Sequence, residues 1–315
     1  MKYGIMCAMK KKGELLLRMA DEKKTSAVML DSISCGDCEE LMKQLPDNSV
    51  DLIFTSPPYA DQRVYGNLKC ATIAPDSYVE WFAPKAREMY RILKDDGSFI
   101  LNINDKVVDG FQHLFVLDLV IYLCRVVNFH LVRDYVWYNP ATPPNIYSSG
   151  KFGRTKKSHE YCYWFSKSDK WVFNLDAIRK PYGKSMQKYL NGEGKGARRN
   201  NTRPSTHSFD CEKVWLDHGG ADPGSIIQIS NTASTDSFFK MCKELGIKHP
   251  ARFPVKLAEF FIKAGSNENA VVLDPFMGSG TTAVAAKRLS RHWIGFELNK
   301  DYCNLATRRV SEVKK

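Results

Sequence analysis

Two short segments contain residue types that could perform chemistry, although they lie far apart in the sequence. The first, Ser56-Pro57-Pro58-Tyr59, follows the apolar run Val50–Thr55. Two prolines fix two φ angles and remove two backbone donors. The carbonyl groups before and between them can therefore face a pocket as hydrogen-bond acceptors, and Tyr59 adds a flat aromatic face. This combination suits a planar substrate that bears an amino group, but a strand that merely ends in two prolines would have the same sequence.

The second segment runs from Asp274 to Thr282 and reads Asp-Pro-Phe-Met-Gly-Ser-Gly-Thr-Thr. Its glycines would let the backbone approach a ligand closely, and ligands of open α/β sheets bind at the carboxyl ends of strands. Glu297 ends the next apolar run, about twenty residues after the glycines, where its carboxylate could accept hydrogen bonds from both hydroxyls of a ribose. The segment indicates an adenosine-containing ligand. It lacks the third glycine of a dinucleotide site and the Gly-Lys-Thr of a phosphate loop.

Around both segments the hydrophobic pattern alternates between strand-like and helix-like stretches. Apolar runs of strand length are found at Ala27–Ser34, Val50–Thr55, Ser98–Ile103, His130–Trp137, Glu160–Phe165, Ala270–Asp274 and Trp293–Glu297. Helical spacing is found at about Cys38–Gln44, Ser77–Leu93, Phe111–Val126, Pro254–Ala264, Gly278–Leu289 and Asp301–Val313. Such alternation predicts a parallel sheet that is covered by helices.

Composition and charge indicate a globular protein with a polyanionic partner. The chain has 315 residues, 43% of them hydrophobic, and a formal net charge of +11. The alternation breaks between Ser166 and Lys248, where Lys and Arg are interleaved with aromatic residues and glycine. That mixture suits contact with the phosphates and bases of DNA, although a flexible surface insert would also have it. The predicted DNA contacts are Lys184, Lys188, Arg198, Arg199 and Arg203.

The cysteines and the N-terminal segment add no further chemistry. The nine cysteines are scattered, which is typical of reduced thiols in a cytosol. Cys35 and Cys38 form a CxxC pair, but a second pair with matching spacing is missing, so no metal is expected. Residues 1–26 are rich in lysine and lack the features of a signal peptide, and no apolar run is long enough to cross a membrane.

Together these segments resemble the amino-group DNA methyltransferases of bacterial restriction–modification systems. Ser56–Tyr59 matches the family's catalytic motif, Ser/Asn/Asp-Pro-Pro-Tyr/Phe, and Asp274–Gly280 is similar to its methyl-donor motif. His249–Pro254 resembles the segment that packs against the methionine end of the donor, and Lys157–Lys167 resembles a segment near the target-base pocket. The likeness covers most of residues 30–312, except the basic insert, which in the family is the variable target-recognition region.

The resemblance implies an α/β architecture, the Rossmann-like fold of S-adenosylmethionine-dependent methyltransferases. The catalytic motif precedes the donor motif, which marks the β group and a circularly permuted, mostly parallel seven-stranded sheet with an inserted target-recognition region. Since the chain after Glu297 has room for only one helix, Ala27–Ser34 would lie beside the strand that ends at Glu297. The expected divisions are an arm (1–26), a catalytic half (27–165), the insert (166–248) and a donor-binding half (249–315).

The resemblance also implies an activity, the transfer of a methyl group from S-adenosylmethionine to the N4 amino group of a flipped-out cytosine in double-stranded DNA. The Ser56 hydroxyl and the Pro57 carbonyl would accept the two N–H groups, Pro58 would complete the turn, and Tyr59 would stack on the base. Asp37 would approach the adenine of the donor, although it could equally be a helix cap. The predicted donor-binding residues are Asp37, Thr55, His249, Phe253, Pro254, Asp274, Pro275, Phe276, Gly278, Gly280, Thr281, Thr282 and Glu297.

Several alternatives stay open from the sequence. The target could be the N6 amino group of adenine, since aspartate and serine present an oxygen to the same kind of amino group, and an RNA substrate is conceivable. A catalytically inactive DNA-binding protein and a nucleotide-dependent oxidoreductase are two further classes. We expect a protein of the prokaryotic cytosol or nucleoid, a monomer or homodimer without membrane contact, whose cognate restriction endonuclease would act separately.

Overall fold

The structure, a computed structural model, describes residues 29–60, 73–142, 153–193, 217–231, 238–247 and 252–313. These residues form two compact units. One consists of the described residues within Met1–Phe173 and Ser225–Lys315, and the other lies within Asn174–Gly224. The larger unit contains both segments that the sequence analysis singled out.

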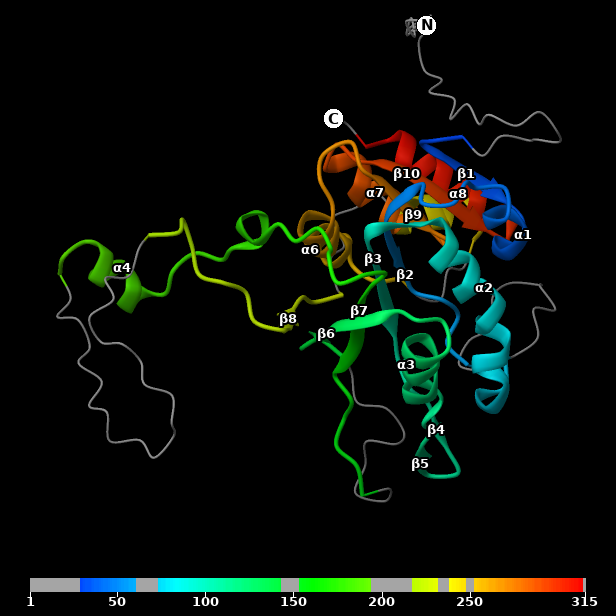
Figure 1. Cartoon of the computed structure of the whole chain (residues 1–315), viewed down its shortest axis with the longest axis horizontal. Coiled ribbons are helices and arrows are strands. Elements are labelled where there is room, and N and C mark those ends of the chain that lie inside the picture. Colours follow the sequence, from blue (N-terminus) through cyan, green and yellow to red (C-terminus); the bar gives the residue numbers. More distant parts are fainter. Residues whose placement is uncertain are drawn as a thin grey trace, which may run out of the picture. The chain divides into compact units, whose positions relative to one another are not determined.

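An eight-stranded sheet in the order β1-β10-β9-β2-β3-β7-β6-β8 is the framework of the larger unit (Figure 1). Its strands are β1 (Ser32–Cys35), β2 (Val50–Thr55), β3 (Leu93–Ile103), β6 (His130–Tyr138), β7 (His159–Ser166), β8 (Ile226–Gln228), β9 (Val271–Asp274) and β10 (His292–Glu297). Only β7 runs antiparallel to its neighbours β3 and β6. The expectation of a mostly parallel sheet is confirmed.

The permuted strand order that the sequence predicted is also confirmed. β1 pairs in parallel with β10, with Cys35 opposite Glu297, so the first strand of the chain lies beside the last one. After Glu297 the described residues form one helix, α8 (Lys300–Ser311), and no further strand. The N-terminal strand therefore completes the edge next to the donor motif.

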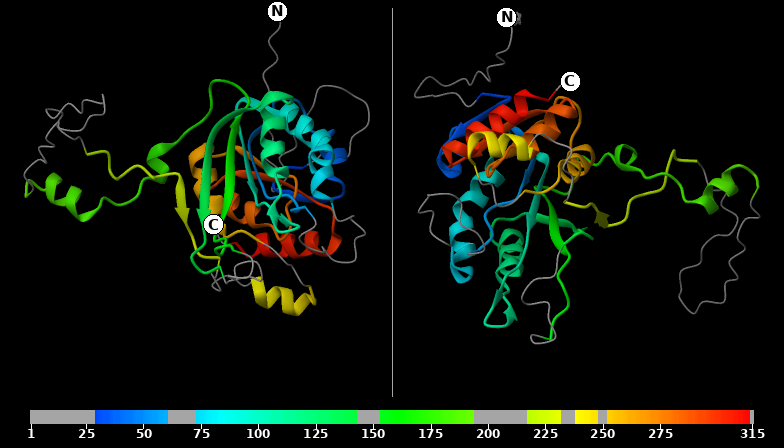
Figure 2. Two further views of the ribbon diagram at one scale, coloured as in Figure 1. Left: turned by 90° about the horizontal axis from the view of Figure 1, so that it is seen from below. Right: turned by 180° about the vertical axis from the view of Figure 1, so that it is seen from behind.

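The sheet is covered on both faces because its central strands are apolar on both sides. Ile53 of β2 belongs to the buried cluster that includes α1 (Cys38–Met42), α2 (Tyr78–Ile92) and α3 (Phe115–Arg125). Phe54, which points to the opposite face, stacks on Phe261 of α6 (Val255–Gly265) at 5.6 Å. Helix α6 contacts α7 (Thr281–Arg288), which contacts α8. Figure 2 shows α2 (cyan) and α3 (blue-green) on one side of the strands and the orange and red helices α6, α7 and α8 on the other.

Three details of the fold differ from the sequence analysis. Strand β3 begins at Leu93 rather than at Ser98, because Leu93 pairs with Val50 of β2. The sheet has eight strands rather than seven, because three residues of the polar insert pair with the edge strand β6 and cover its backbone groups. Residues Phe111–Gln112 (β5) are not the start of a helix but pair with Val107–Val108 (β4). Asp109 and Gly110 between them both have positive φ, as a two-residue hairpin turn requires. Helix α3 therefore begins only at Phe115.

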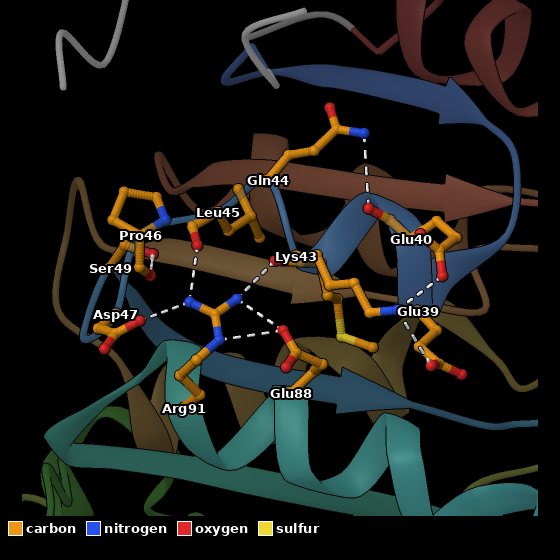
Figure 3. A network of polar contacts seen from close by, with 11 residues as sticks. Glu39, Glu40, Lys43, Gln44, Leu45, Pro46, Asp47, Ser49, Glu88 and Arg91 are labelled. Carbon is orange, nitrogen blue, oxygen red and sulfur yellow. Dashed lines mark hydrogen bonds and ion pairs between the residues drawn. The ribbon is translucent and has the colours of Figure 1, made fainter. Parts of the chain in front are cut away.

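Arg91 of α2 holds α1 in place against α2 (Figure 3). Its guanidinium donates to the carbonyl groups of Met42 and Leu45, both at 2.9 Å, and so satisfies acceptors at the C-terminal end of α1. Glu88 and Asp47 neutralise its charge. Because α1 follows β1 directly, this contact helps to set the position of Asp37 and the donor edge.

Helices are also found outside the two layers. Helix α5 (Phe238–Leu245) packs on α8, and the smaller unit contains the 3-10 helix η3 (Leu175–Ile178) and helix α4 (Lys184–Leu190); another 3-10 turn, η1 (Pro75–Ser77), precedes α2. In the part of the chain that the structure describes, no helix is long and apolar enough to span a membrane.

Candidate active site

The two segments with candidate chemistry meet at one edge of the sheet. Strands β2 and β9 are parallel neighbours, with Ile53 opposite Leu273, so the turns that follow them emerge side by side. The Thr55 hydroxyl donates a hydrogen bond of 2.6 Å to the Asp274 carboxylate and links the two turns directly. The two segments, far apart in the sequence, are therefore adjacent in the structure.

Asp274 is the centre of a buried polar network beneath this edge. Besides Thr55, the Thr282 hydroxyl donates to its second carboxylate oxygen at 2.6 Å, and the Phe276 amide donates at 3.0 Å. The residue is only 1% exposed, and this desolvation raises the pKa of its carboxyl to about 6, although the three donors oppose the rise. The side chains of Thr55, Asp274 and Thr282 are thus engaged with one another, and they shape the loop from below.

Two features set the conformation of the glycine-rich loop: the backbone conformation of Gly280 and close packing against α8. Gly280, at the N-terminus of α7, has a φ of +81°, which favours glycine. A Cβ atom on Gly280 would lie 3.0 Å from the Cβ of Ala306 in α8. Buried Arg309, also on α8, donates to the Ser279 carbonyl at 3.1 Å and to the Thr281 hydroxyl at 2.9 Å. Sequence reasoning missed Arg309, because an arginine in a terminal helix resembles an ordinary surface residue.

Glu297 lies where its carboxylate can hold polar groups of a ligand. One carboxylate oxygen accepts from the Gly278 amide and the other from the Asn299 amide, both at 2.8 Å. Burial raises the pKa of Glu297, while these backbone donors lower it. An ionised carboxylate offers about four acceptor positions, so these backbone donors leave some capacity for a polar group of a ligand.

The structure also places most of the other residues that were predicted to bind the methyl donor. Asp37 caps α1, since its side chain accepts from the Glu39 amide at 2.8 Å, so its role as a helix cap is confirmed. Phe253 is buried and packs edge-on against Phe54 at 5.0 Å, Pro254 precedes α6, and Phe276 packs against Trp81 and Phe82 of α2. Pro275 is buried. His249 lies outside the described residues.

The Ser56–Tyr59 turn is held by hydrogen bonds to residues from other strands and helices. The Tyr78 hydroxyl of α2 donates to the Pro58 carbonyl at 2.8 Å, which fixes the turn without using the Pro57 carbonyl. The Ser56 hydroxyl donates to the Tyr59 hydroxyl at 3.1 Å, and Tyr59 donates to Glu160 of β7 at 2.7 Å. Burial, followed by the charge of Glu160, raises the pKa of Tyr59 well above its ordinary value. Stacking alone would not require these contacts of the Tyr59 hydroxyl.

A small cavity of about 60 Å³ opens beside Glu160. Its lining includes Asn104, Trp137, Asn139 and His159. The pKa of His159 is lowered, mainly by burial, which favours the neutral imidazole. Polar and aromatic groups thus surround the Glu160 carboxylate on this side.

The predicted DNA contacts and the cysteines are only partly described. Lys184 and Lys188 are exposed one turn apart on α4, whereas Arg198, Arg199 and Arg203 lie outside the described residues.

In the CxxC pair, Cys35 is exposed, and burial raises the pKa of Cys38 to about 12. Within the described ranges, no group of three or more His, Cys, Asp or Glu residues is placed to hold a metal ion.

The sequence is similar to known DNA methylases. The N6/N4 DNA methylase family model matches residues 50–308. Type II methyltransferase M.PvuII of Proteus hauseri is 36% identical over 278 residues, which cover 86% of this chain and 81% of that protein. Type II methyltransferase M.BglII of Bacillus subtilis is 28% identical over 284 residues, covering 90% of this chain and 69% of that protein.

Solved structures give the same result. The cytosine-N4-specific PvuII DNA methyltransferase superimposes with a TM-score of 0.68 at 30% identity, covering 90% of this chain and 88% of that one. The complex of M1.HpyAVI with S-adenosylmethionine shares the fold, with a TM-score of 0.54 at 22% identity, over 89% of this chain and 98% of that one. The fold and the site define a methyltransferase of the Rossmann-like class. Within that class, the chain belongs to the N6/N4 DNA methylase family.

Proposed function

We propose that this protein transfers a methyl group from S-adenosylmethionine to the N4 amino group of a cytosine that has been flipped out of double-stranded DNA. The observation that carries the proposal is the hydrogen bond from Thr55 to Asp274, which joins the Pro-Pro turn and the glycine-rich turn into one site. Two observations favour cytosine. Ser56 begins the motif, and the chain is 36% identical to M.PvuII, whose name matches a solved DNA methyltransferase that is specific for cytosine N4.

The donor would lie over the glycine-rich loop. Glu297 would accept hydrogen bonds from its ribose hydroxyls, and Asp37, on the neighbouring strand end, would approach its adenine. Thr55, Asp274 and Thr282 would act indirectly, by holding the loop in place. When bound, the donor supplies a methyl group on a positively charged sulfur, so no enzyme nucleophile is required.

The acceptor turn would prepare the amino nitrogen of the base. Conjugation with the ring makes the lone pair of this nitrogen a poor nucleophile. If the Ser56 hydroxyl and the Pro57 carbonyl accept its two N–H groups, the nitrogen becomes more tetrahedral and its lone pair becomes available. Positioning and electrostatics then supply most of the acceleration. The cavity beside Glu160, with Trp137 at its wall, would receive part of the flipped base.

The exposed lysines of α4 support a role of the basic insert in DNA binding. Lys184 and Lys188 lie one helical turn apart and can meet neighbouring phosphates. We further infer that the enzyme belongs to a type II restriction–modification system, since relatives such as M.PvuII and M.BglII are type II methyltransferases. A cognate endonuclease would then be a separate protein.

Product analysis tests the proposal most directly. The protein is incubated with labelled S-adenosylmethionine and a mixture of duplex DNA sequences, and the DNA is digested to nucleosides for mass spectrometry. We expect labelled N4-methylcytosine. Labelled N6-methyladenine would show that the target base is adenine, and unlabelled DNA despite donor binding would contradict the proposed activity.

A further inference from the structure

A directed chain of hydroxyl groups leads from the acceptor turn to a carboxylate on β7. The phenol of Tyr59 has one proton, and its two acceptors are Glu160 at 2.7 Å and the Asn102 side-chain oxygen at 3.3 Å. The shorter contact to a carboxylate is the stronger bond, so the proton points to Glu160. Tyr59 therefore receives the Ser56 proton, at 3.1 Å, on its oxygen lone pair. This direction leaves the lone pairs of the Ser56 oxygen available to an incoming amino group.

Buried Asn102 holds the end of this chain in place. Its side-chain amide donates to Glu160 at 3.4 Å, to the Tyr161 carbonyl at 3.1 Å and to the Cys162 sulfur at 3.6 Å. Strand β3 supplies Asn102 and strand β7 supplies Glu160, and their antiparallel pairing places Asn102 opposite Cys162. Because two rigid strands fix both side chains, Glu160 has a defined position relative to Tyr59.

We propose that Glu160 is the final acceptor of the proton that the target amino group loses, and that the proton reaches it through the hydroxyls of Ser56 and Tyr59. This inference rests on the proposed function and assigns to this chain two positioning residues, Tyr59 and Glu160, that act through Ser56. A neutral phenol is suited to the middle of such a chain, because it passes one proton on as it receives another.

The transfer balances in atoms and charge. The nitrogen lone pair forms the bond to the methyl carbon, the sulfur–carbon bond of the donor breaks, and its electron pair returns to the sulfur. The methylated nitrogen then has one proton too many. That proton moves to the Ser56 oxygen, the Ser56 proton moves to Tyr59, and the Tyr59 proton moves to Glu160. The two hydroxyls end neutral, and Glu160 ends as a carboxylic acid that water can later deprotonate.

Single-turnover methylation by Glu160→Gln and Tyr59→Phe tests this chain. Each variant keeps the shape of its side chain, so we expect donor affinity to stay unchanged while the methylation rate falls on the order of 100-fold, the scale of acid–base catalysis. The double variant should lose little more than either single one, because both remove the same path. A wild-type rate in Glu160→Gln, or additive losses in the double variant, would overturn the proposal. Tyr163→Phe, which removes a tyrosine hydroxyl from the same strand as Glu160, is the matched control.

The pH profile gives a readout that a merely structural role would not change. If Glu160 is the final proton acceptor, the wild-type rate should fall under acidic conditions, and this acid limb should be absent in Glu160→Gln. The titratable groups near Glu160 or along the same cavity are Tyr59, Cys162, His159 and Lys157 with its ion-pair partner Asp105. If the limb persists in Glu160→Gln but disappears in His159→Gln, the proposal is wrong. Wild-type protein that forms no methylated cytosine would contradict the proposed function instead.

Discussion

The two turns of the site use their side chains in opposite ways. In the donor loop, Asp274 and Thr282 are buried and bond to each other, and Asp274 also bonds to Thr55 at the end of β2. In the acceptor turn, Ser56 and Tyr59 extend a chain of hydroxyls toward Glu160. The donor loop is thus a rigid scaffold, whereas the acceptor turn contains the groups that would handle protons.

Because of this difference, we expect substitutions in the two turns to change different properties of the protein. A change in the donor network should appear first in the free energy of unfolding, because buried donors and acceptors lose their partners. A change in the acceptor turn should appear first in the chemical step. Three measurements test whether stability and the methylation rate respond separately in this way.

Ser56→Ala should have the largest effect. It removes both the proposed acceptor of the amino group and the first hydroxyl of the chain, so we expect the single-turnover methylation rate to fall about 1000-fold. Donor affinity, measured by calorimetry, should stay near the wild-type value, because Ser56 bonds to Tyr59 and not to the donor loop. A parallel loss of donor affinity would show that the two turns are not separable.

Asp274→Asn should change the dependence of stability on pH. Folding raises the pKa of this carboxyl from 3.8 to about 6, so between these values the folded protein binds more protons than the unfolded chain. The contribution of this group to stability is therefore highest below about pH 4 and declines as the pH rises to 6, by about 1.4 kcal/mol for each pKa unit.

The asparagine variant should lack this decline, so its free energy of unfolding should improve relative to wild type between pH 4 and 7. Urea titrations over that range provide the measurement. Glu80→Gln, which removes an exposed carboxylate from α2, is the control and should follow wild type. Parallel curves for wild type and Asp274→Asn would contradict a buried, desolvated carboxylate at the centre of the network.

Gly280→Ala should have a smaller effect that reports on loop packing. The new methyl group would meet Ala306 at 3.0 Å in a backbone conformation with positive φ, and we expect a loss of about 2 kcal/mol in the free energy of unfolding. Gly246→Ala is the matched control, since Gly246 also has a positive φ but has nothing within 4 Å of a Cβ atom. It should lose about 1 kcal/mol or less. Equal losses would show that packing against α8 does not constrain the loop.

Local sequence patterns predicted most of the framework of the larger unit. The apolar run before Pro57 predicts β2 with its observed bounds, and the run before Asp274 predicts β9 to within one residue. The short hairpin before Phe115 and the strand β8 were missed, because two or three residues carry no readable periodicity and form strands only by pairing with a neighbour. The insert and its DNA-contact residues stay predictions.

The sequence by itself determined the two motifs, the elements that carry them and the permuted order of the strands, since proline, glycine and apolar periodicity act over a few residues. Only the tertiary structure decided which side chains surround the motifs. Asn102 and Glu160 meet because β3 and β7 pair in one particular antiparallel register, and Arg309 reaches the glycine-rich loop because α8 packs against it. Such contacts depend on the register and packing of segments far apart in the chain, and no local pattern encodes either.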